Sequence, residues 1–532
     1  MLSNKYIAVI GLATALLSGC KEDEIIVDDN FDRPINVAAP ILKSESSAKA
    51  LVEEWLSGTE WYTDEDGVLT TTYTSIDSAS ATDVLKLNDV QCTISSPLSS
   101  TLGATQSFLF YSEPLNSEPN QRFDYIRIKE GYINLTSPAS TASGHAVLSL
   151  MDKNGVVKDT KGQDFSASWE IEKGTSQKVD LSGFVISPIE KDGNWYVKTL
   201  VTLTNLSDAD GATLQFSYKS SGVTVGEARG YFGNIVVLTD NSTTRIAAFD
   251  RSNFPDEVDF KGVYTDFTVS STIGVPLEWK MGTITFTSRN DKDLDLNYDF
   301  GASVFPQQSY ADYLKENVLT PQTKEIHIDE ENSNIQDVIN LHPVRYSYGV
   351  NVVANPDGEV EGETNFVTED SKFISEMKTT IPLWMRVSNM DREDHVDVDF
   401  DEIFNDDNID YVDTVKIILK SINGMPLKAT GQGYFCVGKT RVAPLFSEDK
   451  VLCKAPELDS NDKVKEPVTQ ETVATLTHDQ AKLYYEAGVD ELYFESVITT
   501  TDDYGDKFVK FYGDYGLIFK ISVEVVSSAK DK

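Results

Sequence analysis

The side chains that most often bind transition metals or transfer protons are few in this chain. There are five histidines, at His145, His327, His342, His395 and His478. Each falls in a different predicted element, and none forms a His-x-His or His-x-x-x-His pair. No pair of cysteines has the spacing of a zinc finger. The sequence therefore predicts no transition-metal site and no cofactor, and it favours a surface or capping role for each histidine.

Acidic segments are the second source of chemistry, because calcium is bound by six to eight oxygens that converge from a curved loop. Asp397, Asp399 and Asp401 alternate with apolar residues, which predicts one shared strand face, and the acidic segment 405–410 follows. The segments 152–155 and 208–211 begin like EF-hand loops but lack the glutamate at the twelfth position. We expect no metal site, and calcium at the loop after Asp401 stays an open alternative.

Catalytic motifs are absent from the sequence. There is no Gly-x-Ser-x-Gly elbow, no Walker loop and no dinucleotide fingerprint. Paired carboxylates for glycoside hydrolysis meet in space and not along the chain, so the 85 acidic residues leave that chemistry open. The sequence nevertheless favours a protein that is not an enzyme, with no catalytic residue to assign.

Aromatic side chains are the remaining candidates for a binding site. Most of the six tryptophans sit in strand patterns and are expected in the core. Trp61-Tyr62 and Asn194-Trp195-Tyr196 lie beside turn residues, where an exposed ring is easier to accommodate. These two places are the predicted platforms for sugar rings.

Cysteine usage fits an exported protein. Apart from Cys20, the chain has Cys92, Cys436 and Cys453. Cys436 and Cys453 lie at opposite ends of an apparent strand-loop-strand, where a bridge could contribute about 3 kcal/mol in the chain-entropy model. The alternative is that both are buried free thiols that pack as small hydrophobes.

Length and charge limit the architecture and the partners. A chain of 532 residues is expected to form two to four domains. The formal net charge of −39 disfavours nucleic acid and anionic membrane surfaces as partners, because both are polyanions.

The N-terminus carries an export signal. Residues 1–17 have a lone Lys5 followed by an apolar run that is too short to span a membrane. The run ends in Leu17-Ser18-Gly19-Cys20, which has the form of a lipobox, and Lys21-Glu22-Asp23-Glu24 follows.

These residues resemble the surface lipoproteins of Bacteroidota. The resemblance covers Leu17 to Glu24 only. It implies cleavage before Cys20, lipidation of Cys20 with fatty acids such as palmitate, and a lipid anchor in the outer membrane that faces the cell exterior. It also implies an accessory role that many such proteins have in glycan capture.

The rest of the chain is dominated by a period of two, which is typical of half-buried antiparallel strands. Alternation on both sides of a turn predicts hairpins at 201–218, 284–300 and 383–400, and the chain closes with a strand at 517–525. Helices are few, and their patterns and capping residues predict them at 48–56, 309–317, 334–341 and 477–488.

Two short motifs recur. Ser-x-x-Gly-x-Pro-Leu occurs at 271–277 and 421–427, and Gly-Tyr-Phe occurs at 230–232 and 433–435. The separation of 150 residues between the first pair suits duplicated domains and not a small solenoid repeat. We therefore expect a mainly β protein of two or three tandem antiparallel sandwich-like modules. The expected divisions are a signal peptide at 1–19, a lipidated acidic tether at 20–43, and β-rich modules at 44–250, 251–400 and 401–532.

Function follows from location and architecture only, because no motif specifies it. The leading hypothesis is a surface lipoprotein that acts as a non-catalytic binding or accessory protein, with a polysaccharide as partner. The second hypothesis is a structural or adhesive envelope protein, such as a fimbria-like subunit or anchor, with an envelope protein as partner. A secreted hydrolase is the third.

Overall fold

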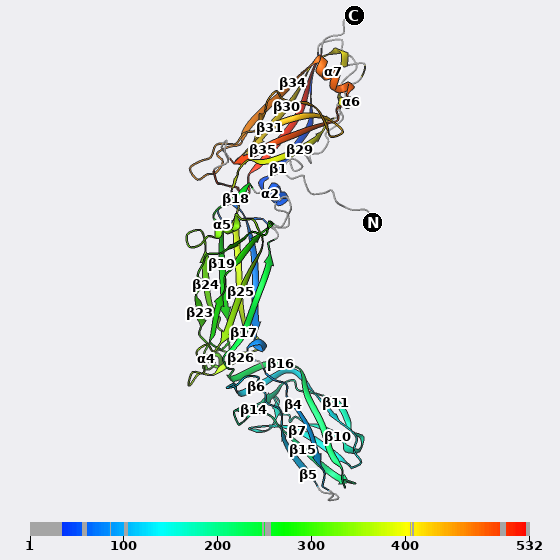
Figure 1. The fold of residues 1–532 in the computed structure, drawn as a ribbon, viewed down its shortest axis with the longest axis vertical. Coiled ribbons are helices and arrows are strands. Elements are labelled where there is room, and N and C mark those ends of the chain that lie inside the picture. The colour runs from blue at the N-terminus through cyan, green and yellow to red at the C-terminus, as the bar shows by residue number, and fades with distance from the viewer. Residues whose placement is uncertain are drawn as a thin grey trace.

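The computed structural model describes residues 35–55, 61–85, 87–99, 105–246, 249, 257–398, 400–404, 406, 409–500 and 507–527. The predicted signal peptide, Cys20 and the segment Lys21–Glu24 lie outside these residues. The molecule is elongated, with three β-rich modules arranged end to end (Figure 1). No helix within the described residues is long and apolar enough to cross a membrane.

The proximal module contains both ends of the described chain, since Ile35 lies opposite Ser527 in one ladder. Its first sheet has the spatial order β1 (Ile35–Ser47), β37 (Gly516–Ser527), β30 (Val412–Asn423) and β34 (Val468–Thr477). Its second sheet has the order β29 (Met390–Asp397), β35 (Glu491–Thr500), β31 (Leu427–Val437) and β32 (Thr440–Pro444), with β33 (Lys450–Cys453) also on β31. Short helices complete it: α2 (Ala48–Trp55), α6 (Phe400–Ile403), η2 (Ile409–Tyr411) and α7 (His478–Glu486).

The middle module has the same two-sheet plan. Its first sheet has the order β2 (Tyr62–Thr63), β3 (Leu69–Ser80), β27 (Lys372–Pro382), β19 (Tyr264–Ser271) and β24 (Gln322–Ile328). In its second sheet β25 (Pro343–Ala354) lies between β17 (Ile235–Arg245) on one side and β20 (Leu277–Met281) and β21 (Thr285–Ser288) on the other, with β23 (Ala302–Phe305) and β22 (Asp293–Asp295) outside these. Its helices are α3 (Ala81–Leu85), α4 (Tyr310–Glu316) and α5 (Ile335–Ile339).

The distal module lies at the far end from both chain ends (Figure 1). In its first sheet β4 (Gln91–Pro97) pairs with β16 (Thr213–Tyr231), which pairs with β6 (Arg122–Ser137), and β11 (Thr175–Asp180), β12 (Phe184–Ile186) and β9 (Lys158–Asp159) follow. Its second sheet has the order β5 (Gln106–Tyr111), β15 (Lys198–Ser207), β7 (Ser143–Asp152) and β10 (Ala167–Glu170), with β8 (Gly155–Val156) on β7. A hairpin of β13 (Ile189–Lys191) and β14 (Asn194–Tyr196) and the short helix η1 (Ile171–Lys173) complete it.

All three modules share one topology. Eight principal strands are numbered 1 to 8 in chain order in each module, and one sheet then has the order 1-8-3-6 and the other the order 2-7-4-5, with every pair antiparallel. The numbered strands are β1, β29, β30, β31, β32, β34, β35 and β37 in the proximal module, β3, β17, β19, β20, β23, β24, β25 and β27 in the middle module, and β4, β5, β6, β7, β10, β11, β15 and β16 in the distal module. This order is that of the eight-stranded jelly roll, a double-sheet fold. The expected mainly β class with antiparallel sandwich modules and short helices is confirmed.

The modules are nested and not consecutive. The middle and distal modules are both inserted between the first and second strands of the proximal module, which are β1 and β29. The distal module is inserted in turn between the first and second strands of the middle module, which are β3 and β17. The chain therefore passes first through the first strands of the proximal, middle and distal modules in turn. It then forms the remaining strands of the distal module, those of the middle module and finally those of the proximal module.

The two joints between modules are built alike. At the distal joint, β26 (Asn365–Thr368) leaves the loop before the eighth strand of the middle module and pairs with β16. At the proximal joint, β36 (Val509–Lys510) leaves the corresponding loop and pairs with β28 (Trp384–Val387), which also pairs with β18 (Val258–Phe260). At each joint the module nearer the chain ends thus donates a strand to the next module outward: β26 joins the first sheet of the distal module, and β36 forms a small sheet with β28 and β18.

Side-chain contacts also stabilise the distal joint. The guanidinium of Arg229 lies 3.9 Å from the ring centre of Tyr125 and 5.0 Å from that of Tyr310 on α4. The Tyr310 hydroxyl donates to Glu227 at 3.0 Å. One cluster of buried apolar side chains runs through the distal and middle modules and into the proximal module, where it includes Met425, Leu427 and Leu517, and a second fills the rest of the proximal module. Apolar packing is therefore continuous across both joints.

Local sequence signals account for the elements that were expected. In β37 the buried residues Ile521, Val523 and Val525 alternate with less buried ones, as the period of two predicts. Helix α7 begins with the capping box of Thr477 and Gln480, which satisfies backbone N–H groups at its first turn. Helices α2, α4 and α5 also lie within the ranges predicted for them.

Two of the three expected hairpins are wrong. Only 284–300 forms one, between β21 and β22. Strands β15 and β16 flank the turn at 208–212 but lie in opposite sheets, and β28 and β29 also lie in different sheets. A turn between alternating segments looks the same in sequence whether the chain folds back beside itself or crosses the sandwich.

The strand pairing also departs from the consecutive divisions expected at 44–250, 251–400 and 401–532. Residues 35–43, assigned to the tether, belong to β1 and pair with β37. Strand β3 pairs with β27, which places residues from the expected first module in the middle one. Alternation marks a strand but does not specify its partner, so the nesting has no local signal.

The recurring Ser-x-x-Gly-x-Pro-Leu motif does mark equivalent places. In both copies it leads from the third strand to the fourth and therefore from one sheet to the other. The Phe366 N–H donates to the Gly274 carbonyl at 2.9 Å, and the Gly424 N–H donates to the Gly516 carbonyl at 2.8 Å. The Gly-Tyr-Phe repeats are not equivalent, since one ends the eighth strand of the distal module and the other lies in the fourth strand of the proximal module.

Gly274→Ala is predicted to destabilise the middle module. A Cβ at this position would lie 2.2 Å from the Phe366 ring, so the joint strand β26 would have to shift. We expect a loss of about 1–3 kcal/mol, typical of overpacking, measured by urea unfolding of the full chain. Gly282→Ala is the control, because its Cβ would meet its nearest neighbour at 3.4 Å. An unchanged midpoint for Gly274→Ala would contradict the close approach.

Candidate functional site

The histidines lie apart, and each is held by a neighbour of its own. His145 contacts Glu170, His395 contacts Glu491, and the side chain of His478 contacts the Val412 carbonyl. His342 is buried, with its Nε2 atom 2.6 Å from the Val258 carbonyl. Within the described residues, no group of three or more histidine, cysteine or acidic side chains is arranged to hold a metal ion.

The acidic segments singled out in the sequence have structural roles where they are described. Both carboxylate oxygens of Asp152 accept backbone N–H groups, from Asn154 at 2.7 Å and Ser187 at 2.8 Å, so Asp152 fixes a turn. Strand β29 ends at Asp397 and α6 begins at Phe400, so 397–401 is not the single strand that was predicted. Asp399 and much of 405–410 lie outside the described residues.

Of the two alternatives for Cys436 and Cys453, the bridge is not present, and Cys92, Cys436 and Cys453 are buried free thiols. Cys453 lies opposite Ala429 on β31, and Cys436 is seven residues further along that strand. Seven residues of strand span roughly 23 Å, whereas a disulfide needs Cα atoms closer than about 7 Å. The second alternative from the sequence, free thiols that pack as small hydrophobes, is the one observed.

The two predicted aromatic platforms are only partly exposed. Trp61 is buried, and its neighbour Tyr62 is 44% exposed. The Trp195 indole is partly buried and donates to the Gln121 carbonyl at 2.6 Å. Tyr196 packs edge-on against Tyr111 with ring centres 5.6 Å apart. Trp61 is therefore a core residue, whereas Trp195 and Tyr196 are both half-buried.

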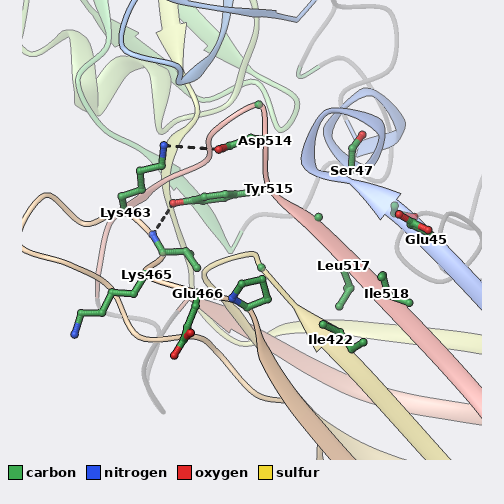
Figure 2. A pocket seen from close by; sticks show the side chains of 16 residues that line it. Glu45, Ser47, Ile422, Lys463, Lys465, Glu466, Asp514, Tyr515, Leu517 and Ile518 are labelled. Atoms are coloured by element: carbon green, nitrogen blue, oxygen red, sulfur yellow. Dashed lines mark hydrogen bonds and ion pairs between the residues drawn. The ribbon is translucent and has the colours of Figure 1, made fainter.

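A pocket of about 470 Å³ lies in the proximal module near its joint (Figure 2). Its walls come from the end of β1, the 463–467 segment and the start of β37. Several of its polar groups are already paired: Lys463 with Asp514 at 3.7 Å, Lys465 with Glu457 at 3.1 Å, and the Tyr515 hydroxyl with the Val464 N–H at 2.8 Å. These contacts brace the loops that carry the joint strand, which indicates a structural role.

A second hollow, of about 460 Å³, lies on the outer face of the first sheet of the middle module. Strand register explains its shape. Thr268 on β19 is flanked by Glu325 on β24 and Glu376 on β27. In the next row, Asp266 is flanked by His327 and Lys378. Because threonine is short, the longer side chains around it form walls, and we call this hollow the sheet-face groove.

The polar groups of the sheet-face groove are only partly used. His327 is held between two carboxylates, with Nδ1 2.6 Å from Asp266 and Nε2 3.4 Å from Asp329. Within the described residues, the side chains of Glu325, Glu376 and Lys378 have no hydrogen bond or ion pair. The groove therefore offers carboxylate acceptors and an ammonium donor to a ligand.

Aromatic rings lie at one end of the sheet-face groove. Tyr264 lies two residues before Asp266 on the same face of β19, and its ring centre is 5.3 Å from that of His327. Burial raises the pKa of Tyr62, and the neighbouring Tyr264 and Asp64 add to this rise. The arrangement places a tyrosine ring beside a hollow whose exposed side chains are polar.

Sequence reasoning missed this groove. The alternation of Tyr264, Asp266 and Thr268 with buried residues marks a solvent-facing side of a strand. Nothing in that pattern shows that β24 and β27, which begin 58 and 108 residues after β19 begins, bring Glu325 and Glu376 to either side of Thr268. His327 was noted only as an isolated histidine.

The fold and the groove together define an elongated protein of three nested jelly rolls with a polar hollow on one sheet face. No protein-family model matches the chain, and no curated protein matches it in sequence. A crystal structure of "a putative secreted protein" from Parabacteroides distasonis ATCC 8503 matches with a TM-score of 0.29 and 11% identity, over 56% of this chain and 89% of that one. The VP2 subviral particle of infectious bursal disease virus matches with a TM-score of 0.13 and 7% identity, over 90% of this chain and 86% of that one. At these scores the likenesses carry no argument about fold or function.

The thiols are predicted to be unreactive in the folded protein. Burial raises the pKa of Cys453 to about 12 and that of Cys92 to about 11, and burial together with Glu491 raises the pKa of Cys436. At pH 8 all three are protonated, and the thiolate is the reactive form. In a Cys20→Ala chain, an aromatic disulfide reagent should therefore titrate three thiols promptly in urea and far more slowly without it. Only one reactive thiol in urea would contradict the absence of a bridge.

Proposed function

We propose that this protein is a lipid-anchored surface protein that binds a neutral polysaccharide without catalysis. The single observation that carries the proposal is the sheet-face groove of the middle module. Carboxylates and a lysine that have no partner inside the described chain surround a short threonine there, beside a tyrosine ring. Carboxylates accept and ammonium groups donate hydrogen bonds, which matches the paired hydroxyls of a sugar.

Charge argues for a neutral ligand. The groove holds Asp266, Glu325 and Glu376 against one lysine, Lys378, so its local charge is negative. The whole chain carries −39. Uronic or sulfated polysaccharides would be repelled by this field, whereas uncharged sugars would not.

The geometry supports binding over hydrolysis. Glycosidases keep one carboxyl group protonated by burying it against apolar neighbours. Glu325 is exposed and Glu376 is half-buried, and both stand on an open sheet face. The proposal therefore assigns no catalytic residue.

The N-terminal signal supports the location. The lipobox at Leu17–Cys20 and the acidic segment Lys21–Glu24 resemble an outer-membrane anchor with a surface-export signal. The described chain begins in the proximal module, so an anchor at Cys20 would leave the middle and distal modules projecting outward (Figure 1). A structural or adhesive role in the envelope is the second candidate, favoured by the rod-like arrangement of the modules.

The groove is tested by affinity electrophoresis of the full chain in gels that contain neutral polysaccharides (β-glucan, mannan, xylan or dextran). We expect retardation by at least one of them. Glu376→Ala combined with Lys378→Ala should weaken this binding about tenfold or more, because hydrogen bonds to charged groups contribute about 1.5–3 kcal/mol each.

The matched control is Glu471→Ala combined with Lys520→Ala, on the outer face of the equivalent proximal sheet. This variant should bind as the wild type does. Retention of binding by the groove variant would contradict the proposed site. The absence of retardation by every neutral polysaccharide would contradict a glycan ligand and favour the structural role. Release of reducing sugar during the assay would contradict the non-catalytic role.

Anchoring is tested separately by Cys20→Ala. The thiol of Cys20 is the acceptor for the lipid thioether, so its loss should move the protein from the detergent phase to the aqueous phase in detergent partitioning of labelled cells. Ser18→Ala, in the same motif but without a thiol to remove, should stay in the detergent phase. Equal partitioning of Cys20→Ala and the wild type would contradict lipidation.

A further inference from the structure

Strand β5 (Gln106–Tyr111) ends the second sheet of the distal module. It pairs with β15 on one side, and within the described residues no strand pairs with its other side. An unpaired strand edge presents backbone N–H and C=O groups that can accept another strand. This edge belongs to the module furthest from both chain ends (Figure 1).

The three modules can be compared at this place, because each has an equivalent second strand at the edge of its second sheet. Strand β29 of the proximal module carries five charged residues among its eight, and β17 of the middle module carries Asp240 and Arg245. Strand β5 reads QSFLFY and carries no charge, no proline and no glycine. Charges on an edge strand discourage pairing between molecules, and only the distal module lacks them.

Two of the three outward side chains of β5, those of Leu109 and Tyr111, are apolar or aromatic and accessible. Leu109 is 52% exposed and Tyr111 is 38% exposed. The inward side chain of Phe110 packs on Phe216 with ring centres 6.1 Å apart, which ties the strand to the core. Strand β5 is therefore an edge strand that packs on the core and exposes Leu109 on its outward face.

Charge favours contact between two distal modules. Residues 91–231 contain 15 acidic and 12 basic residues, a net charge of −3 out of −39. Two copies approaching through these modules meet little repulsion, whereas the rest of each chain carries nearly all of the negative charge.

We infer that β5 pairs with β5 of a second copy of this chain. An antiparallel pair with its twofold axis at Leu109 places Leu109 opposite its counterpart and Tyr111 opposite Ser107 of the partner subunit. Apolar and aromatic cross-strand pairs of this kind stabilise a sheet. The inference is independent of the groove, which lies on another module.

The test is sedimentation velocity of the full chain carrying Cys20→Ala across a concentration series. A contact through one strand edge is small, and small interfaces are weak, so we expect a monomer–dimer equilibrium in the micromolar to millimolar range. Leu109→Lys should abolish the dimer, because it places two like charges directly opposite each other at the centre of the strand pair. Val236→Lys, at a 45% exposed residue of the equivalent strand β17, should leave the dimer unchanged. Circular dichroism confirms that both variants are folded.

A second measurement tests the register. Leu109→Cys in the same background should form an intermolecular disulfide under mild oxidation, since opposed residues in an antiparallel pair have Cα atoms about 4.5–5.5 Å apart. Val236→Cys should not. A wild-type chain that stays monomeric at about 1 mM would overturn the inference. Equal loss of the dimer in both lysine variants would do so too, as would the absence of an intermolecular cross-link in the Leu109→Cys variant.

Discussion

The antiparallel ladder between the first and the eighth strand of each module is the interaction on which the whole structure depends. In the proximal module it joins Ile35 to Ser527, and in the middle module it joins Ser80 to Lys372. Bringing such distant residues together costs loop-closure entropy that grows only slowly with loop length. The ladder nevertheless forms slowly, because pairing between residues far apart in the sequence lowers the folding rate.

Nesting reduces that difficulty if the chain folds from the inside outward. Once the distal module has formed, its own ends at β4 and β16 lie paired side by side. The first and second strands of the middle module are then held near each other, although 154 residues separate the end of β3 from the start of β17. The same holds for the proximal module after the middle one has formed. The joint strands β26 and β36 come from the loops that precede the eighth strands of the modules that donate them.

Much of the local structure could be predicted from the sequence, and little of the assembly could. The period of two identified β37, the capping box identified α7, and the motif at 271 and 421 identified equivalent crossings between sheets. The hairpins expected at 201–218 and 383–400 failed because a sandwich crossing and a hairpin share one pattern. The choice between a bridge and free thiols at Cys436 and Cys453 stayed open in the sequence, because sequence proximity gives no strand register. The sheet-face groove could not be predicted for the same reason, since its walls come from three strands whose pairing and register are not visible in the sequence.

The outward course of the chain through first strands also determines how the molecule would carry tension. A pull between the N-terminal end of β1 and the middle module would travel along β1, then α2, and then into β3, through peptide bonds all the way. Strand β1 is already extended, so pulling can lengthen it very little. Helix α2, with eight residues, can lengthen by roughly 15 Å when its rise changes from helix to strand. The strands of the proximal module that follow β29 are outside this covalent path, so they can stay folded while α2 acts as the extensible link.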